Sequence, residues 1–270
     1  MIQLIKGYWR GFVGGPSFDQ AVNHKFILED KQLTVTLPNT NLAVVPNKID
    51  ISFPYTSACW FDENKKMYEQ HTFVRIVTSA WMYVPVISII PGDEFGMLSC
   101  QLRIKQTDKI NVFDKQALAV FVIQAYNDFH NGSDGKNTKI RKEITEQSSK
   151  MAVPFTAEEL EEEITGWIEN RGKPPIPPAQ MIKFNQNDWV FYQEVRSNSL
   201  SRNDYYCLPL NESSFLEVKF DHSVDRSDKH KKWSKAALAS QQQIMESIRL
   251  TPILDEKNNL LVDNVTKDKA

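Results

Sequence analysis

The sequence is poor in the residues that mark several specialised classes of protein. Its three cysteines, Cys59, Cys100 and Cys207, are far apart and follow no metal-ligand spacing, so neither a disulfide framework nor a zinc site is indicated. Ten glycines among 270 residues argue against glycine-rich phosphate-binding loops and repeat solenoids. The formal net charge is only -2, which gives no general attraction to nucleic acid or to an anionic membrane.

Long hydrophobic runs and familiar catalytic motifs are missing as well. The longest apolar run, 80–90, is interrupted by Pro85 and is too short to cross a bilayer. The first residues lack the charged and then apolar pattern of a secretory signal, so we expect a cytoplasmic protein. Neither a nucleophile elbow, a Walker A loop, a dinucleotide-binding glycine motif nor a His-Glu-x-x-His motif occurs.

What is present is the material of an ordinary globular core. Hydrophobic residues make up 41% of the chain and charged residues 24%, as in typical folded domains of this size. Alternating or β-branched apolar residues predict a series of strands. The predicted strands are 25–28 and 33–37, which form a hairpin, then 49–53, 73–77, 80–90, 98–104, 180–185, 189–196, 205–210 and 215–221.

Three segments have the apolar periodicity of amphipathic helices, 114–130, 156–170 and 231–250. The second has a complete start signal, because Thr156 is followed three residues later by Glu159, as in a capping box. The third is expected to lie on the apolar face of the strand that precedes it. Its predicted buried face consists of Trp233, Ala237, Leu238, Ile244, Met245 and Ile248.

These elements predict an α+β fold, a mostly antiparallel sheet or sheets with about three main helices. In each half of the chain several strands precede a helix, which is consistent with two similar β-rich halves, each closed by a helix, or with one sheet that carries both helices. We place the N-terminal half at 1–135, closed by helix 114–130, and a polar linker at 136–155. The C-terminal half, 156–270, then holds helix 156–170, strands 180–221 and helix 231–250.

No catalytic residue, cofactor site or metal site is predicted. The only local group of potential metal ligands comprises Asp221, His222, Asp225, Asp228 and His230. Its spacing matches no known motif, and a polar turn with Ser227 or Asp228 as the helix N-cap explains it better. Cys59 is a conceivable nucleophile, but nothing nearby in the sequence supplies a base.

Two charged clusters are the candidate contacts for a partner. Lys229, His230, Lys231 and Lys232 place positive charge at a helix start, where it opposes the helix dipole. Glu158 and Glu162 belong to an acidic run at the start of helix 156–170, where the dipole favours them. A solvated surface explains both clusters equally simply, so they stay candidates.

The C-terminal pattern carries a resemblance. It consists of a strand that ends in Phe220, a polar turn, a basic helix start with Trp233, and the closing sequence Ile-Met-Glu-Ser-Ile-Arg-Leu at 244–250. This pattern resembles the end of PsbP-like α+β proteins of bacteria, including some immunity proteins paired with type VI secretion effectors. The resemblance covers about 35 residues and implies a non-enzymatic protein that binds another protein.

The leading functional expectation is therefore a soluble bacterial protein-binding module, an immunity or accessory protein that binds a toxin or effector. We expect no nucleic-acid partner and no membrane span. Two alternatives stay open. One is a structural or assembly component. The other is an enzyme whose site is assembled from distant residues, such as Cys59, or His24 or His71 with carboxylates.

Overall fold

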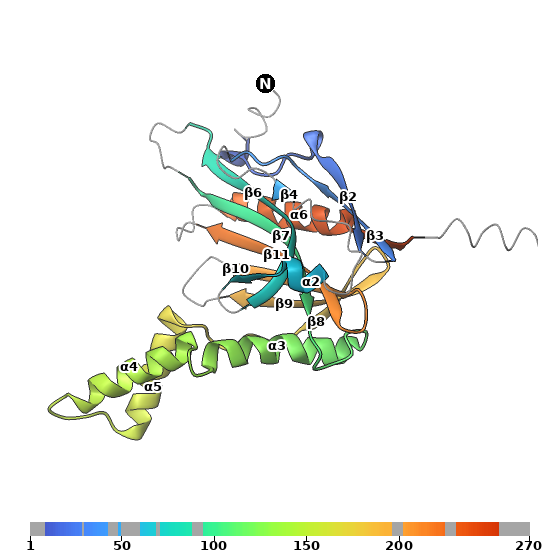
Figure 1. Cartoon of the computed structure of the whole chain (residues 1–270). Coiled ribbons are helices and arrows are strands. Elements are labelled where there is room, and N and C mark those ends of the chain that lie inside the picture. The colour runs from blue at the N-terminus through green and yellow to red at the C-terminus, as the bar shows by residue number, and fades with distance from the viewer. Residues whose placement is uncertain are drawn as a thin grey trace, which may run out of the picture.

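The computed structural model describes residues 9–28, 30–42, 48–49, 60–68, 71–87, 94–195, 202–224 and 231–253. Within these residues the strands form a nine-stranded sheet and a three-stranded sheet (Figure 1). The large sheet has the order β1-β6-β7-β11-β10-β9-β8, and β4 and β5 also pair with β6. Its strands are β1 (Phe12–Gly14), β4 (Lys48–Ile49), β5 (Lys66–Tyr68), β6 (His71–Pro85), β7 (Gly96–Gln106), β8 (Gln180–Phe184), β9 (Asn187–Val195), β10 (Arg202–Pro209) and β11 (Ser214–Val224).

The small sheet and one helix cover one face of the large sheet. The small sheet has the order β12-β3-β2, with β2 at Val22–Leu28, β3 at Lys31–Leu37 and β12 at Arg249–Pro252. Helix α6 (Lys231–Ser247) contacts both β3 and β11 and lies between the two sheets (Figure 1). Its residues Trp233, Ala237, Ile244 and Met245 are buried in one core with residues from both sheets.

Helix α3 (Lys115–Asn131) covers the opposite face of the large sheet. Its apolar side packs on β9, β10 and β11, where Val190, Cys207 and Phe215 belong to the same buried cluster. Asp114 caps the helix by accepting hydrogen bonds from the backbone N–H groups of Gln116 and Ala117. Because side chains alternate across a strand, Leu102, Ile104, Leu216 and Val218 of β7 and β11 belong to the core that contains α6, whereas Arg103, Lys105 and Lys219 lie on the face covered by α3.

Helices α4 (Lys136–Ser149) and α5 (Ala157–Arg171) form a hairpin that projects away from the sheets (Figure 1). A small core of its own, Ile140, Ile144 and Ile164, holds the two helices together. Thr156 and Glu159 make the expected capping box at the start of α5. The hairpin is therefore an appendage joined to the body at one end.

The predicted fold class is confirmed, since the chain is α+β with a large antiparallel sheet. The hairpin at 25–37 and most of the other predicted strands are present, whereas 73–77 and 80–85 are parts of one long strand, β6, which ends at Pro85. Of the predicted strands 80–90 and 49–53, residues 88–90 and 50–53 lie outside the described residues. The segment 136–155, predicted as a polar linker that could hold a short helix near 140–146, contains the longer helix α4 at Lys136–Ser149. The two predicted halves are joined edge to edge, since β7 pairs with β11 along its whole length.

Two details of the third helix also differ from the prediction. It ends at Ser247, because residues 249–252 pair with β3 as strand β12. Leu238 was expected on the buried face but is exposed, while Trp233, Ala237, Ile244, Met245 and Ile248 are buried as predicted. Residues 225–230, where a polar turn is predicted, lie outside the described residues.

Candidate functional site

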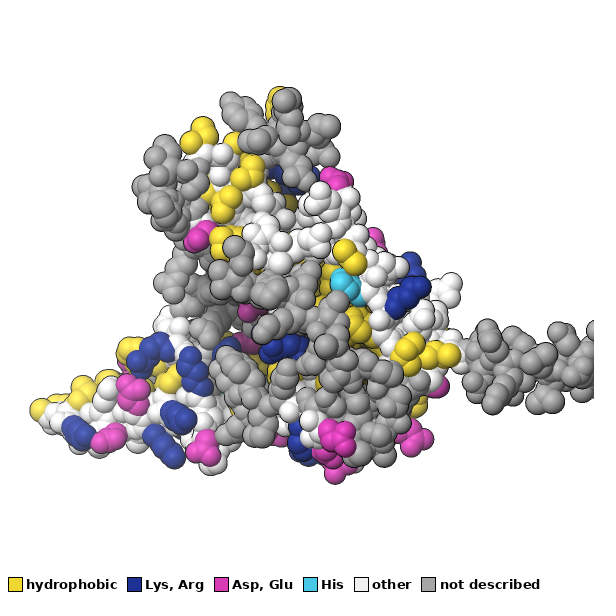
Figure 2. All heavy atoms as spheres, turned by 45° about the horizontal axis from the view of Figure 1, so that its top comes forward, with side chains coloured by type: hydrophobic (Ala, Val, Ile, Leu, Met, Phe, Trp, Pro, Cys, Tyr) yellow, Lys and Arg dark blue, Asp and Glu magenta, His cyan; other side chains and the backbone are white. Residues whose placement is uncertain are grey.

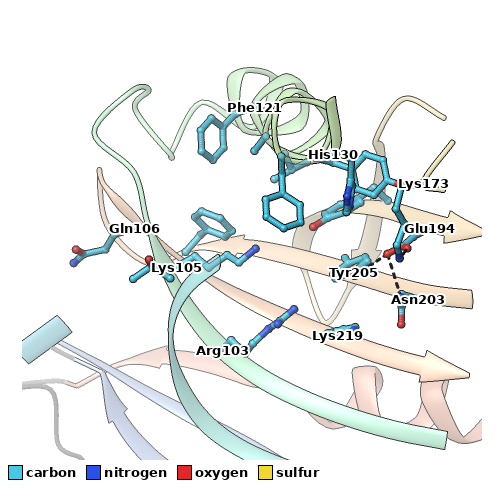
Figure 3. Close-up of a pocket in the computed structure, with 17 residues that line it drawn as sticks. Arg103, Lys105, Gln106, Phe121, His130, Lys173, Glu194, Asn203, Tyr205 and Lys219 are labelled. Carbon is cyan, nitrogen blue, oxygen red and sulfur yellow. Dashed lines mark hydrogen bonds and ion pairs between the residues drawn. The ribbon is translucent and has the colours of Figure 1, made fainter. Parts of the chain in front are cut away.

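A cleft of about 290 Å³ lies between α3 and the polar face of the large sheet (Figure 3). Four adjacent strands supply its floor, and each contributes alternate side chains that point toward the helix. The main floor residues are Arg103 and Lys105 from β7, Lys219 from β11, Asn203 and Tyr205 from β10, and Tyr192 and Glu194 from β9. The cleft thus gathers charged and phenolic groups beneath a helix.

Glu217 is the fully buried anion behind this floor. Its carboxylate lies 2.6 Å from Arg103 Nη2 and 3.0 Å from Lys105 Nζ, and the Tyr192 hydroxyl donates a hydrogen bond to it at 3.1 Å. Burial raises the pKa of Glu217, but the charges of Lys105 and Arg103 outweigh burial and lower that pKa to about 2. Glu217 is therefore ionised at neutral pH and holds two cations in place.

Glu194 is the second carboxylate of the cleft. It forms an ion pair with Lys173 and accepts hydrogen bonds from the side chains of Asn203 and Tyr205. Burial raises the pKa of Glu194, but Lys173, the Asn203 hydrogen bond and the charge of Lys219 together outweigh burial, so the pKa is lowered. The Glu194 carboxylate is therefore also ionised, and its oxygens have ion-pair and hydrogen-bond partners.

Lys219 has weaker support than the other cations. Its ammonium lies 3.9 Å from the nearest described carboxylate oxygen, that of Asp221, and 5.7 Å from the centre of the Tyr205 ring. Burial lowers the pKa of Lys219. Its ion pair with Asp221 is thus longer than those of Arg103, Lys105 and Lys173 in the same cleft.

The roof of the cleft is apolar. Helix α3 turns Phe121, Val122, Ala125 and Phe129 toward the floor, with Tyr126 and His130 beside them (Figure 3). A cavity with an apolar wall and a few converging polar groups is the usual form of a small-ligand site. No residue of this cleft was predicted as a site residue. The available signal was that both β7 and β11 carry charged residues at alternate positions while α3 has an apolar face that must be covered.

The structure places the predicted contacts Glu158 and Glu162 on one exposed face of α5, a single turn apart. The other glutamates of that run have intramolecular roles. Glu159 is in the capping box, Glu161 pairs with Arg141, and Glu163 accepts a hydrogen bond from the Trp167 indole. Among the described residues no basic group pairs with Glu158 or Glu162, so these two remain open to a partner.

The free end of the α4–α5 hairpin is apolar. Met151 is 45% exposed and Val153 79% exposed, and they lie in the turn just before α5. Figure 2 shows hydrophobic side chains gathered at this end and charged side chains along the hairpin. We call Met151 and Val153 the hairpin tip. Exposed apolar side chains at the end of a projecting element are typical of interaction sites.

The structure describes two of the four residues of the predicted basic cluster, Lys231 and Lys232. Lys229 and His230 lie outside the described residues, as do the positions of Asp225 and Asp228. Lys231 begins α6, and the Lys232 side chain is exposed. Lys231 and Lys232 belong to α6, whereas the two glutamates belong to α5.

No metal site was expected around His222, because the spacing of the His and Asp residues at 221–230 matches no known metal-binding motif. In the structure Asp221 lies on the cleft side of β11, near Lys219, whereas His222 is buried on the side of α6. His222 Nε2 lies 2.5 Å from Gln241 Oε1, and the Gln241 amide donates to Asp204 and to the Tyr206 hydroxyl. Across the residues that the structure describes, no three His, Cys, Asp or Glu side chains are grouped to hold a metal ion.

Of the residues considered for an enzymatic site, His24 is the one whose side chain the structure describes. His24 is buried in β2 and stacks on Phe26, and burial lowers its pKa. Cys59 lies outside the described residues, and for His71 only the backbone, in β6, is described. In the described part of the chain no helix has the length and hydrophobicity needed to span a membrane.

Together these features define an α+β protein with a cationic cleft on one side and a projecting helical hairpin. No protein-family model matches the chain, and no curated protein sequence matches it. Among solved structures, the crystal structure of LpqN, involved in cell envelope biogenesis of Mycobacterium tuberculosis, is similar over 92% of this chain and 95% of that chain. The sequence identity is 8% and the TM-score 0.27, values too low to support any inference about function.

Proposed function

We propose that this chain is a non-enzymatic protein-binding module whose docking element is the free end of the α4–α5 hairpin. One observation carries the proposal: Met151 and Val153 are exposed at the end of a helical pair that contributes nothing to the main cores. Apolar side chains in such a position are desolvated only when a partner covers them.

The charges beside the tip indicate the chemistry of the partner. Glu158 and Glu162 are exposed, are close to the tip along α5, and have no described basic neighbour. A complementary partner surface has an apolar pocket for Met151 and Val153 and basic side chains at its rim. An anionic membrane is disfavoured, because it would repel the two carboxylates.

The class of partner that the C-terminal resemblance suggests is a toxin or effector protein. In that role the chain would bind and neutralise the effector as an immunity protein, or carry it as an accessory protein. This finer proposal rests on the resemblance of 215–250, and the hairpin tip supports only the coarser one, that the partner is a protein.

The test uses the purified products of genes adjacent to this one. Binding of the full chain to each product is measured by titration calorimetry, and cells that make an adjacent toxin are assayed for protection by the chain. The double variant Met151→Ser/Val153→Ser is expected to weaken binding at least about tenfold and to abolish protection. Val120→Ser is the matched control, since Val120 is also an exposed apolar residue but lies on α3.

Three results would count against the proposal. The first is that no adjacent product binds and none is neutralised. The second is that the tip variant binds as tightly as the wild type. The third is that the tip mediates pairing with a second copy of this chain, seen by sedimentation, which would favour the assembly component instead.

A further inference from the structure

The cleft beneath α3 carries more positive than negative charge among the described residues. Four cationic side chains line it, Arg103, Lys105, Lys173 and Lys219, and three carboxylates pair with them: Glu194, Glu217 and the partly exposed Asp221, which lies 3.9 Å from Lys219. Glu217 is shared by Arg103 and Lys105, and Glu194 is paired with Lys173. Positive charge held away from water without a counter-charge is unfavourable, so the cleft favours an anion.

An unused hydrogen-bond donor points to the same conclusion. Arg103 is 8% exposed, and its Nε–H is buried without a hydrogen-bond acceptor among the described residues. Buried polar atoms are normally satisfied, so a buried donor without an acceptor calls for an explanation. An anion in the cleft supplies such an acceptor.

The shape and lining of the cleft limit the size of the ligand. Figure 3 shows the Arg103 and Lys105 side chains reaching from the sheet toward the aromatic side chains of α3. The volume of about 290 Å³ is at the small end of the range for ligand sites. Phe121 and Phe129 give an apolar surface opposite the charged floor. An inorganic ion would leave this surface uncovered.

We propose that the cleft is a binding site for a small organic anion, a single carboxylate or phosphate group on an aromatic or aliphatic body. The anionic group lies against Arg103 and Lys219, and the body lies under Phe121 and Phe129. This site is separate from the hairpin tip and does not depend on the proposed protein partner.

Calorimetry and ligand-observed NMR on the full chain test the proposal with four probes: benzoate, phenyl phosphate, inorganic phosphate and benzamide. Benzoate or phenyl phosphate is expected to bind saturably and to weaken as salt is added. Benzamide, which has the same ring without the charge, and phosphate, which has the charge without the ring, are each expected to bind at least about tenfold more weakly.

The key variant is Lys219→Gln, because the ion pair of Lys219 with Asp221 is long, at 3.9 Å, and partly exposed, so its loss should disturb the fold little. It is expected to weaken the best probe at least about tenfold, whereas Lys219→Arg retains binding. Lys183→Gln, an exposed lysine on β8, is the control and leaves binding unchanged. The proposal is overturned if no anion binds, if benzamide or phosphate binds as tightly as the organic anions, or if a folded Lys219→Gln binds like the wild type.

Discussion

Glu217 Oε1 and Arg103 Nη2 lie 2.6 Å apart across the paired strands β11 and β7, with the Glu217 side chain fully buried. Glu217 also holds Lys105 and accepts a hydrogen bond from Tyr192. One carboxylate thereby links three strands of the sheet on the face covered by α3. Its replacement gives the clearest prediction for stability.

Glu217→Gln is expected to reduce the free energy of unfolding at pH 7 by about 3–5 kcal/mol, because Arg103 and Lys105 lose the anion that compensates their burial. The folded-state pKa of about 2 lies below the ordinary value of 4.5, so the carboxylate stabilises the fold above about pH 4.5, and this contribution is lost as the pH falls toward 2. Urea unfolding at pH 7, 5 and 3 measures this contribution.

The difference in unfolding free energy between wild type and Glu217→Gln should be smaller at pH 3 than at pH 7. An equal difference at both pH values would contradict an ionised Glu217. The control Glu162→Gln, on the surface, should leave the unfolding free energy unchanged at pH 7.

Trp233→Ala is expected to cost about 3–5 kcal/mol of unfolding free energy. Trp233 is 1% exposed and stacks on Tyr83 with ring centroids 4.8 Å apart, so truncation opens a cavity between α6 and the large sheet. Leu238→Ala, on the exposed side of the same helix, should cost less than about 1 kcal/mol. Thermal and urea unfolding compare the two, and equal costs would mean that α6 is rotated from the orientation described.

Asn137→Ala is expected to loosen the base of the hairpin. The Asn137 side chain is buried, donates to the Lys173 carbonyl at 2.7 Å and accepts from the Lys173 N–H at 2.8 Å. Loss of these bonds should cost about 1–3 kcal/mol and speed amide exchange at 172–174. Hydrogen exchange read by mass spectrometry checks this, with exposed Lys139→Ala as the control on the same helix.

Thr156→Ala removes the N-cap of α5. The Thr156 side chain accepts from the Glu159 N–H, and the Glu159 carboxylate accepts from the Thr156 N–H. The change should destabilise the hairpin locally by about 0.5–2 kcal/mol, with faster amide exchange confined to the first turn of α5. Thr165→Ala, an exposed site within the helix, should leave exchange unchanged or slower. Faster exchange in the Thr165 variant alone would be incompatible with this capping role.

Local patterns were sufficient to predict most elements of this fold. The period of α3, the capping box of α5 and the alternation in β7 and β11 all depend on residues near one another in sequence, and each is present. The full extent of helix α4 was not predicted, because most of its residues are polar or charged and its apolar contacts, such as Ile140 with α5, depend on a partner helix. Such a helix is stabilised mainly by packing against its neighbour, so the helix propensities of its own residues predict it poorly.

The cleft could not be predicted because its residues are assembled by strand pairing. Arg103 and Glu217 are more than a hundred positions apart and meet only because β7 and β11 are neighbours in register. The polar faces of these strands suggested exposure to solvent, yet α3 covers them. Glu158 and Glu162, in contrast, were predicted as partner contacts, and the structure leaves both exposed without a described ion-pair partner. That exposure is compatible with a partner contact and does not test one.

Lys173 contacts both the cleft and the base of the hairpin. Its ammonium pairs with Glu194 in the cleft, and its backbone N–H and carbonyl bind Asn137 at the base of the hairpin. An anion that drew the ammonium away from Glu194 would act on the residue that anchors the hairpin. Coupling between two binding sites is reciprocal. If an anion in the cleft changes the affinity of the hairpin tip for a protein, that protein must change the affinity of the cleft for the anion by the same factor.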